Sequence, residues 1–210
     1  MKKVESKREN NKAQKKASFI DAAERLFMQK GFEKTSIDDV AKEAGLTKRT
    51  LYQYFNSKED LFYAVALIGA KQLTSVYEEA FTHGENTLEK IRLANKAYYQ
   101  FYVDYLDMFR ILNYQPANRQ NCASSPHFQE MGVWNAVRMK HYMNLVTEGK
   151  SDGSINPGLD TRKAVFFAFF SAFSLLFTVS STGKEVWDML ELDEDEFLRF
   201  SFDLFVNALK

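Results

Sequence analysis

The sequence of 210 residues predicts an all-α protein. Proline and glycine, which interrupt helices, number only 3 and 9. No segment alternates apolar and polar residues as a half-buried strand would. Apolar residues instead recur at helical spacing, first in Phe19, Ala22, Ala23, Leu26 and Phe27. We therefore expect long helices joined by short connections.

The N-terminal part is expected to hold three helices, after residues 1–11, which are polar and predicted to be disordered or frayed. Gly31 ends the first helix. Ser36 is the expected N-cap of the second, with Asp39 in the capping-box position, and Gly45 ends it. Thr47 then begins the third after a short turn. This arrangement predicts a helix-turn-helix DNA-binding domain over residues 1–57.

The remaining residues, 58–210, are expected to form a second, helical domain. Its predicted helices cover residues 58–82, 87–113, 126–148, 160–182 and 194–209. Ser57 is the expected cap of the first of them, and Ser125 with Pro126 begins the third. Asp193 and Glu196 form a capping pair at the start of the last helix.

Charge is distributed unevenly, although the chain as a whole is neutral. Residues 1–58 hold 14 Lys and Arg against 8 Asp and Glu, and the rest of the chain has the opposite excess. A basic N-terminal part suggests a polyanionic partner for that part alone. Cys122 is the only cysteine, so no disulfide forms within one chain, and a cytoplasmic location is expected.

No secretory signal opens the chain. The longest apolar stretch, residues 165–179, has about 15 residues, fewer than the ~20 that cross a bilayer. We therefore expect a buried or subunit-interface helix there, and no membrane partner.

The third helix carries the predicted base contacts. Leu51 and Phe55 are four residues apart and share its buried face, which leaves the opposite face exposed. That face has no carboxylate and offers hydrogen-bond donors to base edges from Lys48, Arg49 and Gln53. Hydroxyl groups suited to phosphate contacts come from Thr47, Thr50, Tyr52 and Tyr54. Thr35, Ser36 and Lys58 lie at the starts of the neighbouring helices, where backbone N–H groups favour an anion.

Two stretches of the chain resemble the N-terminal domain of TetR-family repressors. They are residues 27–46 (FMQKGFEKTSIDDVAKEAGL) and 50–61 (TLYQYFNSKEDL). The resemblance covers about residues 15–62. It implies an all-helical homodimer with a variable C-terminal ligand-binding and dimerisation domain. Such proteins mostly repress transcription from short palindromic operators and release DNA when a small molecule binds.

Carried over by position, Lys48, Arg49 and Gln53 match base-contacting residues of the family. The positions matching phosphate contacts are Thr35, Ser36, Thr50, Tyr52, Tyr54 and Lys58. Positions 48 and 49 often carry small residues in the family, so the start of this recognition helix is unusually basic.

The last two predicted long helices are apolar on more than one face and therefore need several neighbours. Paired with the same helices of a second chain, they would form a four-helix dimer interface. The residues expected in this interface are Phe166, Phe169, Phe177, Phe197, Phe202 and Phe205.

An effector cavity is expected between the other helices, lined mainly by apolar groups. Its candidate residues are Tyr98, Phe101, Tyr102, Tyr105, Phe109, Trp134, Met139, Tyr142, Met143, Phe170 and Phe173. Each could instead be ordinary core, because aromatic residues at helical spacing normally pack the interior. The composition favours a hydrophobic or aromatic effector.

Signals for catalysis or metal binding are lacking in the sequence. His83, His127 and His141 do not have the spacing of a metal pair on one helix face. There is no nucleophile elbow or phosphate-binding glycine loop, so we expect no enzyme activity, cofactor or metal. Thiol sensing by Cys122 in the loop before residue 126 would need an activating environment.

The sequence favours a dimer whose two recognition helices enter successive major grooves. Effector binding would shift the helix that starts at Lys58 and change the separation of the two DNA-binding domains. One alternative is a helical carrier or enzyme whose basic N-terminal part is incidental. Another is a transcriptional activator. The carrier hypothesis predicts weak, sequence-independent DNA binding and a ligand activity that survives deletion of residues 1–57.

Overall fold

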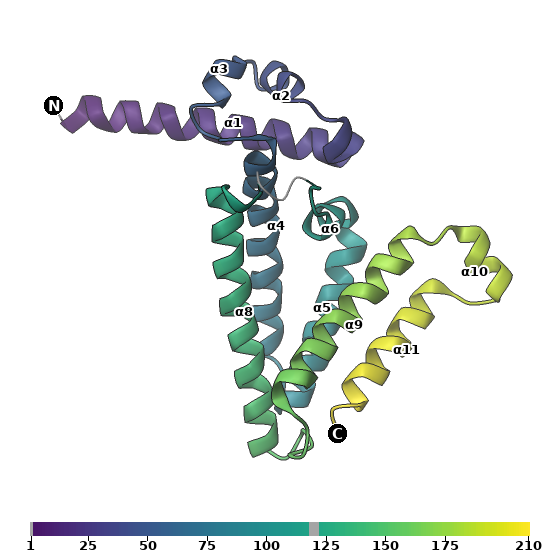
Figure 1. Cartoon of the computed structure of the whole chain (residues 1–210). Coiled ribbons are helices and arrows are strands. Elements are labelled where there is room, and N and C mark those ends of the chain that lie inside the picture. Colours follow the sequence, from purple (N-terminus) through teal and green to yellow (C-terminus); the bar gives the residue numbers. More distant parts are fainter. Residues whose placement is uncertain (1, 118–121) are drawn as a thin grey trace. The chain divides into compact units, whose positions relative to one another are not determined.

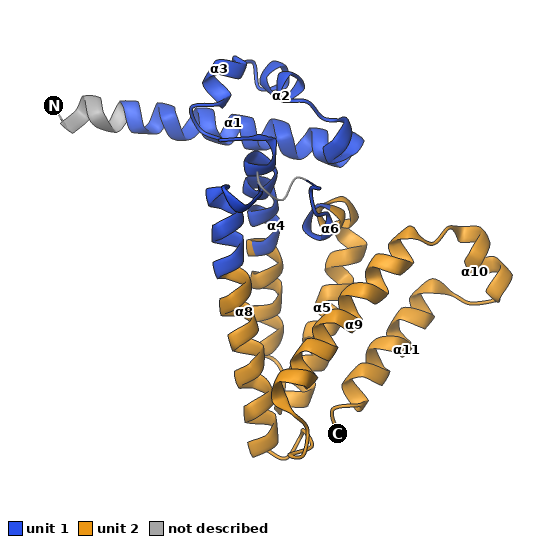
Figure 2. Cartoon of the chain, viewed as in Figure 1, with its two compact units in different colours: residues 1–70, 111–133 blue, residues 71–110, 134–210 orange. Residues whose placement is uncertain are grey.

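The computed structural model describes residues 2–117 and 122–210, with side chains from residue 8 onward. Every regular element in these two ranges is a helix (Figure 1). The chain forms two compact units (Figure 2). Residues 1–70 and 111–133 make the first unit, and residues 71–110 and 134–210 make the second.

In the first unit, α2 (Ile37–Glu43) packs against both α1 (Lys2–Lys34) and α3 (Lys48–Leu51). The expected caps are confirmed: Ser36 and Asp39 form a capping box, and the Thr47 side chain accepts a hydrogen bond from the Thr50 N–H. Gly31 has φ +77°, a conformation that residues with a Cβ rarely adopt, and it interrupts α1.

The helix α1 begins at Lys2, so the prediction that residues 1–11 lack structure is wrong for residues 2–11. Six of residues 2–11 are Lys, Glu or Arg, which have good helix propensity. The side chains of residues 8–15 are exposed, so this extension follows from propensity and continuity with the packed part of α1.

In the second unit, α5 (Thr87–Asp104), α9 (Thr161–Ser181) and α11 (Glu194–Asn207) pack against one another. The start of α9 is capped by Asp160 and the start of α11 by Asp193, whose carboxylate accepts from the Glu196 N–H at 2.9 Å. A core cluster joins these helices to α8 (Pro126–Ser151) through Leu88, Val146, Val165 and Val206.

Two elements differ from the predicted helices. The helix expected over residues 87–113 ends at Tyr105, which has φ −132° and ψ 46°, and α6 (Leu106–Asn113) follows. This bend accompanies the burial of Met108 and Phe109 on α6. A short helix, α10 (Lys184–Leu190), lies in a region predicted to be a connection, and its N-cap Gly183 has no side chain to signal it.

The helix α4 (Lys58–Phe81) begins in the first unit and ends in the second, as α8 also does. The boundary expected after residue 57 stays a prediction, since compactness assigns residues 58–70 to the same unit as residues 1–57. Among the described helices, α9 is long and apolar enough to cross a membrane by length and composition alone. It packs instead on α5 and α11 within the second unit.

Candidate DNA-binding surface and effector domain

The orientation of α3 is fixed by two buried side chains. Leu51 and Phe55 are both 0% exposed, and the Phe55 amide continues the helical turn by donating to the Leu51 carbonyl. The opposite face is open to solvent and carries Lys48, Arg49, Tyr52 and Gln53. The structure therefore brings the predicted base-contacting side chains together on one exposed surface, as the four-residue spacing of Leu51 and Phe55 requires.

The free protein holds Lys48 in an ion pair. Its Nζ lies 2.9 Å from Asp38 Oδ2, and both side chains are largely exposed. The Asp38 carboxylate raises the pKa of Lys48, so the ammonium group is charged at neutral pH. A phosphate or a guanine edge would have to compete with Asp38 for this donor.

Thr35 is not available for the phosphate contact that the sequence suggests. Its side chain is buried, and the hydroxyl donates to the Gly31 carbonyl at 2.8 Å. The hydroxyl thus satisfies a carbonyl at the end of α1, an internal role that removes it from the candidate DNA-contacting side chains. Only a backbone contact at this position would remain possible.

The other phosphate candidates keep at least part of their surface. Thr47 and Ser36 are exposed and act as caps, while Thr50 is half-buried. Tyr54 packs against Phe19 with ring centroids 6.1 Å apart. The Lys58 Nζ lies 4.0 Å from the centroid of the Phe32 ring, and partial burial lowers the pKa of Lys58.

Asp60 lies in the first turn of α4 and holds the start of α8 in the first unit. Its carboxylate, almost wholly buried, accepts from Ser125 Oγ at 2.7 Å and pairs with His127 Nδ1 at 2.6 Å. It also accepts from the Asn56 N–H at 2.9 Å. Burial acts to raise the pKa of Asp60, but these hydrogen bonds outweigh it and the pKa is lowered.

His127 extends this network to the DNA-binding helices. Its ring lies 5.7 Å from that of Phe55, and its Nε2 is 3.3 Å from Nζ of Lys16 on α1. Cys122, expected in an open loop, is buried in the same unit. Its burial removes the exposure that a thiol sensor needs.

The effector candidates fall into two groups. Tyr98, Phe101, Tyr102 and Phe109 are buried on α5 and α6, and Trp134, Met139, Tyr142, Met143 and Phe173 are half-buried. Tyr105 and Phe170 are exposed instead, Phe170 to 57%. Both lie on helix faces that the described part of the chain leaves uncovered, so they do not line an interior cavity of one unit.

The interface candidates also divide. Phe166 and Phe177 are exposed and Phe169 is half-buried, all on α9. Phe202 is buried inside the second unit, where its ring packs against Phe205 at 6.3 Å, so it is not on the exposed face. Phe197 packs on Trp187 at 5.5 Å. The sequence pattern shows that α11 is apolar on several sides but does not show which side meets α5.

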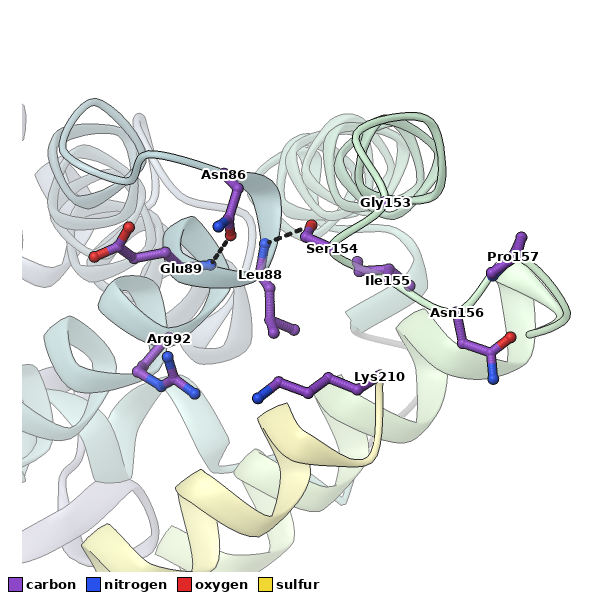
Figure 3. Close-up of a pocket in the computed structure, with 10 residues that line it drawn as sticks. All are labelled: Asn86, Leu88, Glu89, Arg92, Gly153, Ser154, Ile155, Asn156, Pro157 and Lys210. Atoms are coloured by element: carbon purple, nitrogen blue, oxygen red, sulfur yellow. Dashed lines mark hydrogen bonds between the residues drawn. The ribbon is translucent and has the colours of Figure 1, made fainter.

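A pocket of about 670 Å³ lies in the second unit at the start of α5 (Figure 3). The connector from Gly153 to Pro157 and the residue Lys210 complete its wall. Arg92 and Lys210 extend into the same space from opposite sides, and Glu89 lies nearby (Figure 3). None of the effector candidates from the sequence lines this pocket.

Several residues of these sites carry no recognisable pattern in the sequence. No motif points to Asp60, and His127 stands out only as one of three histidines without the spacing of a metal pair. Tyr77 and Arg138, which lie near Tyr98 and Tyr142, belong to no motif either. Asp60 and His127 are 67 positions apart, and the three tyrosines come from three helices, so no local spacing pattern reveals these contacts; only Arg138 and Tyr142 are neighbours on one helix.

Comparison with known proteins agrees with these features. Residues 19–65 match the sequence profile of the bacterial regulatory proteins of the tetR family. The HTH-type transcriptional repressor KstR2 of Mycolicibacterium smegmatis is 24% identical over 148 residues, which are 70% of this chain and 71% of that protein. The fatty acid metabolism regulator protein of Bacillus subtilis is 26% identical over 157 residues, 73% of this chain and 77% of that protein.

Solved structures share the fold. The transcriptional regulator FadR from Bacillus subtilis, in complex with stearoyl-CoA, superposes with a TM-score of 0.70 at 21% identity. The match covers 92% of this chain and 99% of that one. These findings lead to one assignment: residues 19–65 are a TetR-family DNA-binding domain, and the chain is a transcriptional regulator with the fold of the solved structures it matches.

Proposed function

We propose that the protein is a repressor that binds a palindromic operator as a homodimer and releases it when a hydrophobic or aromatic small molecule binds. The observation that carries this proposal is the surface of α3. Lys48 and Arg49 on this helix and Gln53 in the turn that follows it are exposed, while the buried Leu51 and Phe55 fix their orientation. Such side chains make the commonest specific contacts with guanine and adenine in the major groove.

Exposed apolar residues on α9 and α11 support the homodimer. Phe166, Phe170 and Phe177 recur on α9 at intervals of four and seven residues, and Phe200 and Leu204 are four apart on α11. All five are exposed in the single chain. Each apolar side chain that a second copy covered would contribute about 25 cal/mol for every Å² buried.

The aromatic interior of the second unit supports a hydrophobic effector. Two proteins similar to this chain support a hydrophobic effector: one is named a fatty acid metabolism regulator protein, and one solved structure holds stearoyl-CoA. A repressor is favoured because KstR2 is named as one. A regulator of bacterial transcription works on DNA in the cytoplasm, which is therefore the proposed location.

Coupling between effector and DNA would use the helices that run through both units. The helix α4 follows α3 directly in the sequence, and its later turns belong to the second unit. We propose that effector binding shifts α4, alters the separation of the two DNA-binding domains and so removes the register with both half-sites. A few kcal/mol of differential affinity between the two states is enough for such a switch.

Operator binding is tested by a gel shift on the DNA upstream of the protein's own gene, with excess nonspecific competitor. We expect specific retardation that Lys48→Ala/Gln53→Ala removes. The matched control, Lys96→Ala/Gln100→Ala, changes the same residue types on an exposed face of α5 and should leave retardation unchanged.

Retardation that competitor abolishes, or that the α3 variant retains, would mean that the domain binds DNA by charge alone. Unbiased selection of operator sequences would then decide between a different operator and the carrier or enzyme alternative. A reporter gene placed behind the selected operator distinguishes a repressor from an activator.

The dimer is tested by analytical ultracentrifugation. We expect Phe170→Glu to convert a dimer into a monomer, because a carboxylate would be buried without a partner in the interface. Val133→Glu, at an apolar residue exposed to 64% on α8, is the control and should stay dimeric. A wild-type monomer at micromolar concentration would contradict the proposal.

A further inference from the structure

We propose that Arg138 and the hydroxyls of Tyr77, Tyr98 and Tyr142 bind the carboxylate of the effector, which is therefore an apolar acid. This inference rests on the proposed function and specifies its ligand. The four residues come from α4, α5 and α8 and all lie in the second unit.

The three tyrosines form one cluster. The ring of Tyr77 lies 5.9 Å from that of Tyr98 and 5.9 Å from that of Tyr142, by centroid distance. The rings of Tyr77 and Tyr142 meet edge to face, with an interplanar angle of 86°. Three phenol groups from three helices therefore meet in one place, although apolar residues could have packed the same space.

These hydroxyls stay protonated at neutral pH. Burial raises the pKa of Tyr77 and Tyr98, and raises the pKa of Tyr142 to about 12. A protonated phenol donates a hydrogen bond, so the cluster presents donors. Its boundary is apolar, with Phe81 5.9 Å from Tyr142 and Phe109 5.9 Å from Tyr98.

Arg138 supplies a positive charge next to this cluster. It lies one turn before Tyr142 on α8, and its charge acts to lower the pKa of all three tyrosines against the effect of burial. Its guanidinium lies 5.3 Å from the centroid of Phe169 and donates to the Asn135 side chain at 3.1 Å. In the described part of the chain, no carboxylate is paired with it.

Within the described residues, the contacts of the Arg138 guanidinium are an amide and an aromatic ring, which leaves several of its N–H donors unused. Guanidinium groups bind carboxylates through two parallel hydrogen bonds, and the phenols add neutral donors. A ligand that carries only acceptors at its polar end matches this set of donors. The surrounding rings favour an aliphatic or aromatic body for the rest of the ligand.

The test is isothermal titration of the full-length protein with dodecanoate and with 1-dodecanol. We expect dodecanoate to bind the wild type at least ten times more tightly than the alcohol. Arg138→Gln should weaken dodecanoate binding by about 10- to 100-fold, the loss typical of a hydrogen bond to a charged group, and leave the alcohol unchanged. Tyr142→Phe should give a smaller loss of acid binding, and Arg138→Lys should restore part of it.

Arg92→Gln is the matched control, since Arg92 lies in the same unit but lines the pocket of Figure 3. It should bind dodecanoate as the wild type does. The inference would be overturned if the wild type bound dodecanoate and 1-dodecanol equally well, or if it did not bind dodecanoate at all. It would also be overturned if Arg138→Gln bound dodecanoate as tightly as the wild type, or if Arg92→Gln lost this binding instead. Operator retardation by the same preparations is measured in parallel, so that failure of the ligand assignment is distinguished from failure of the DNA-binding proposal. Unchanged circular dichroism and operator binding of Arg138→Gln exclude misfolding.

Discussion

Replacing Asp60 by alanine should loosen the first unit, because this carboxylate is the common acceptor of donors from three residues. Ser125 Oγ, His127 Nδ1 and the Asn56 N–H lie 2.7, 2.6 and 2.9 Å from it. Leaving a buried donor without its acceptor typically costs about 1–3 kcal/mol. Asp60→Ala would leave several such donors, and since the His127 side chain keeps 14% of its surface in water, we expect a total loss of about 3 kcal/mol.

Asp60→Asn provides a graded comparison. The amide keeps one oxygen acceptor but loses the charge, so we expect a loss of about 1–2 kcal/mol, close to one hydrogen bond to a charged group. Asp152→Ala is the matched control in the second unit, where Asp152 accepts from the Thr87 N–H at 2.9 Å and from the Thr87 hydroxyl at 2.7 Å. It should affect the second unit and leave the first unchanged.

Hydrogen exchange measures these effects unit by unit, which matters because two units need not unfold in one two-state transition. In Asp60→Ala, amides at the starts of α4 and α8 should lose protection while those of α9 and α11 keep it. A loss below about 1 kcal/mol would refute the reasoning, since it would mean that the three donors find water or other acceptors at little cost.

Acidification gives an independent check. Because the pKa of Asp60 is lowered on folding, its contribution to stability is fully present above the ordinary carboxyl value of 3.8 and is lost as the pH falls through the lowered pKa. Protection at the starts of α4 and α8 should therefore decrease below about pH 4 in the wild type and vary less in Asp60→Asn.

Three further substitutions test other parts of the structure. Thr35→Val keeps the side-chain shape but loses the hydrogen bond to the Gly31 carbonyl, so denaturation should show an unfolding free energy lower by about 1 kcal/mol, and the salt dependence of DNA binding should not change. Weaker DNA binding at unchanged stability would instead indicate that Thr35 contacts a phosphate. Asp38→Ala releases Lys48 from its ion pair and removes a negative charge beside α3, so gel shifts at low salt should show DNA binding a few-fold tighter. Weaker binding would mean that Asp38 positions Lys48 for contact with its base. Gly149→Ala would place a Cβ 2.5 Å from Cδ1 of the buried Ile155, and this overpacking should reduce the unfolding free energy by about 1–3 kcal/mol. A denaturation midpoint equal to that of the wild type would show that Ile155 can move to make room.

The helical class and most helix starts follow from local patterns in the sequence. Ser36, Ser57 and Asp193 each bond to a backbone N–H three residues later, so the signal and its partner lie within one turn. The exposed face of α3 was determined in the same way, because the spacing of Leu51 and Phe55 fixes which side is buried.

Which distant residues meet depends on the packing of the folded chain. Asp60 and His127 are 67 positions apart, and Thr35 became an internal hydroxyl because the end of α1 folds against it. Arg138 approaches tyrosines from three helices, and Phe202 rather than Phe170 turned inward on packing. Periodicity shows that a helix has an apolar face, but which neighbour covers that face depends on how the connecting segments close, and that is a property of the whole chain.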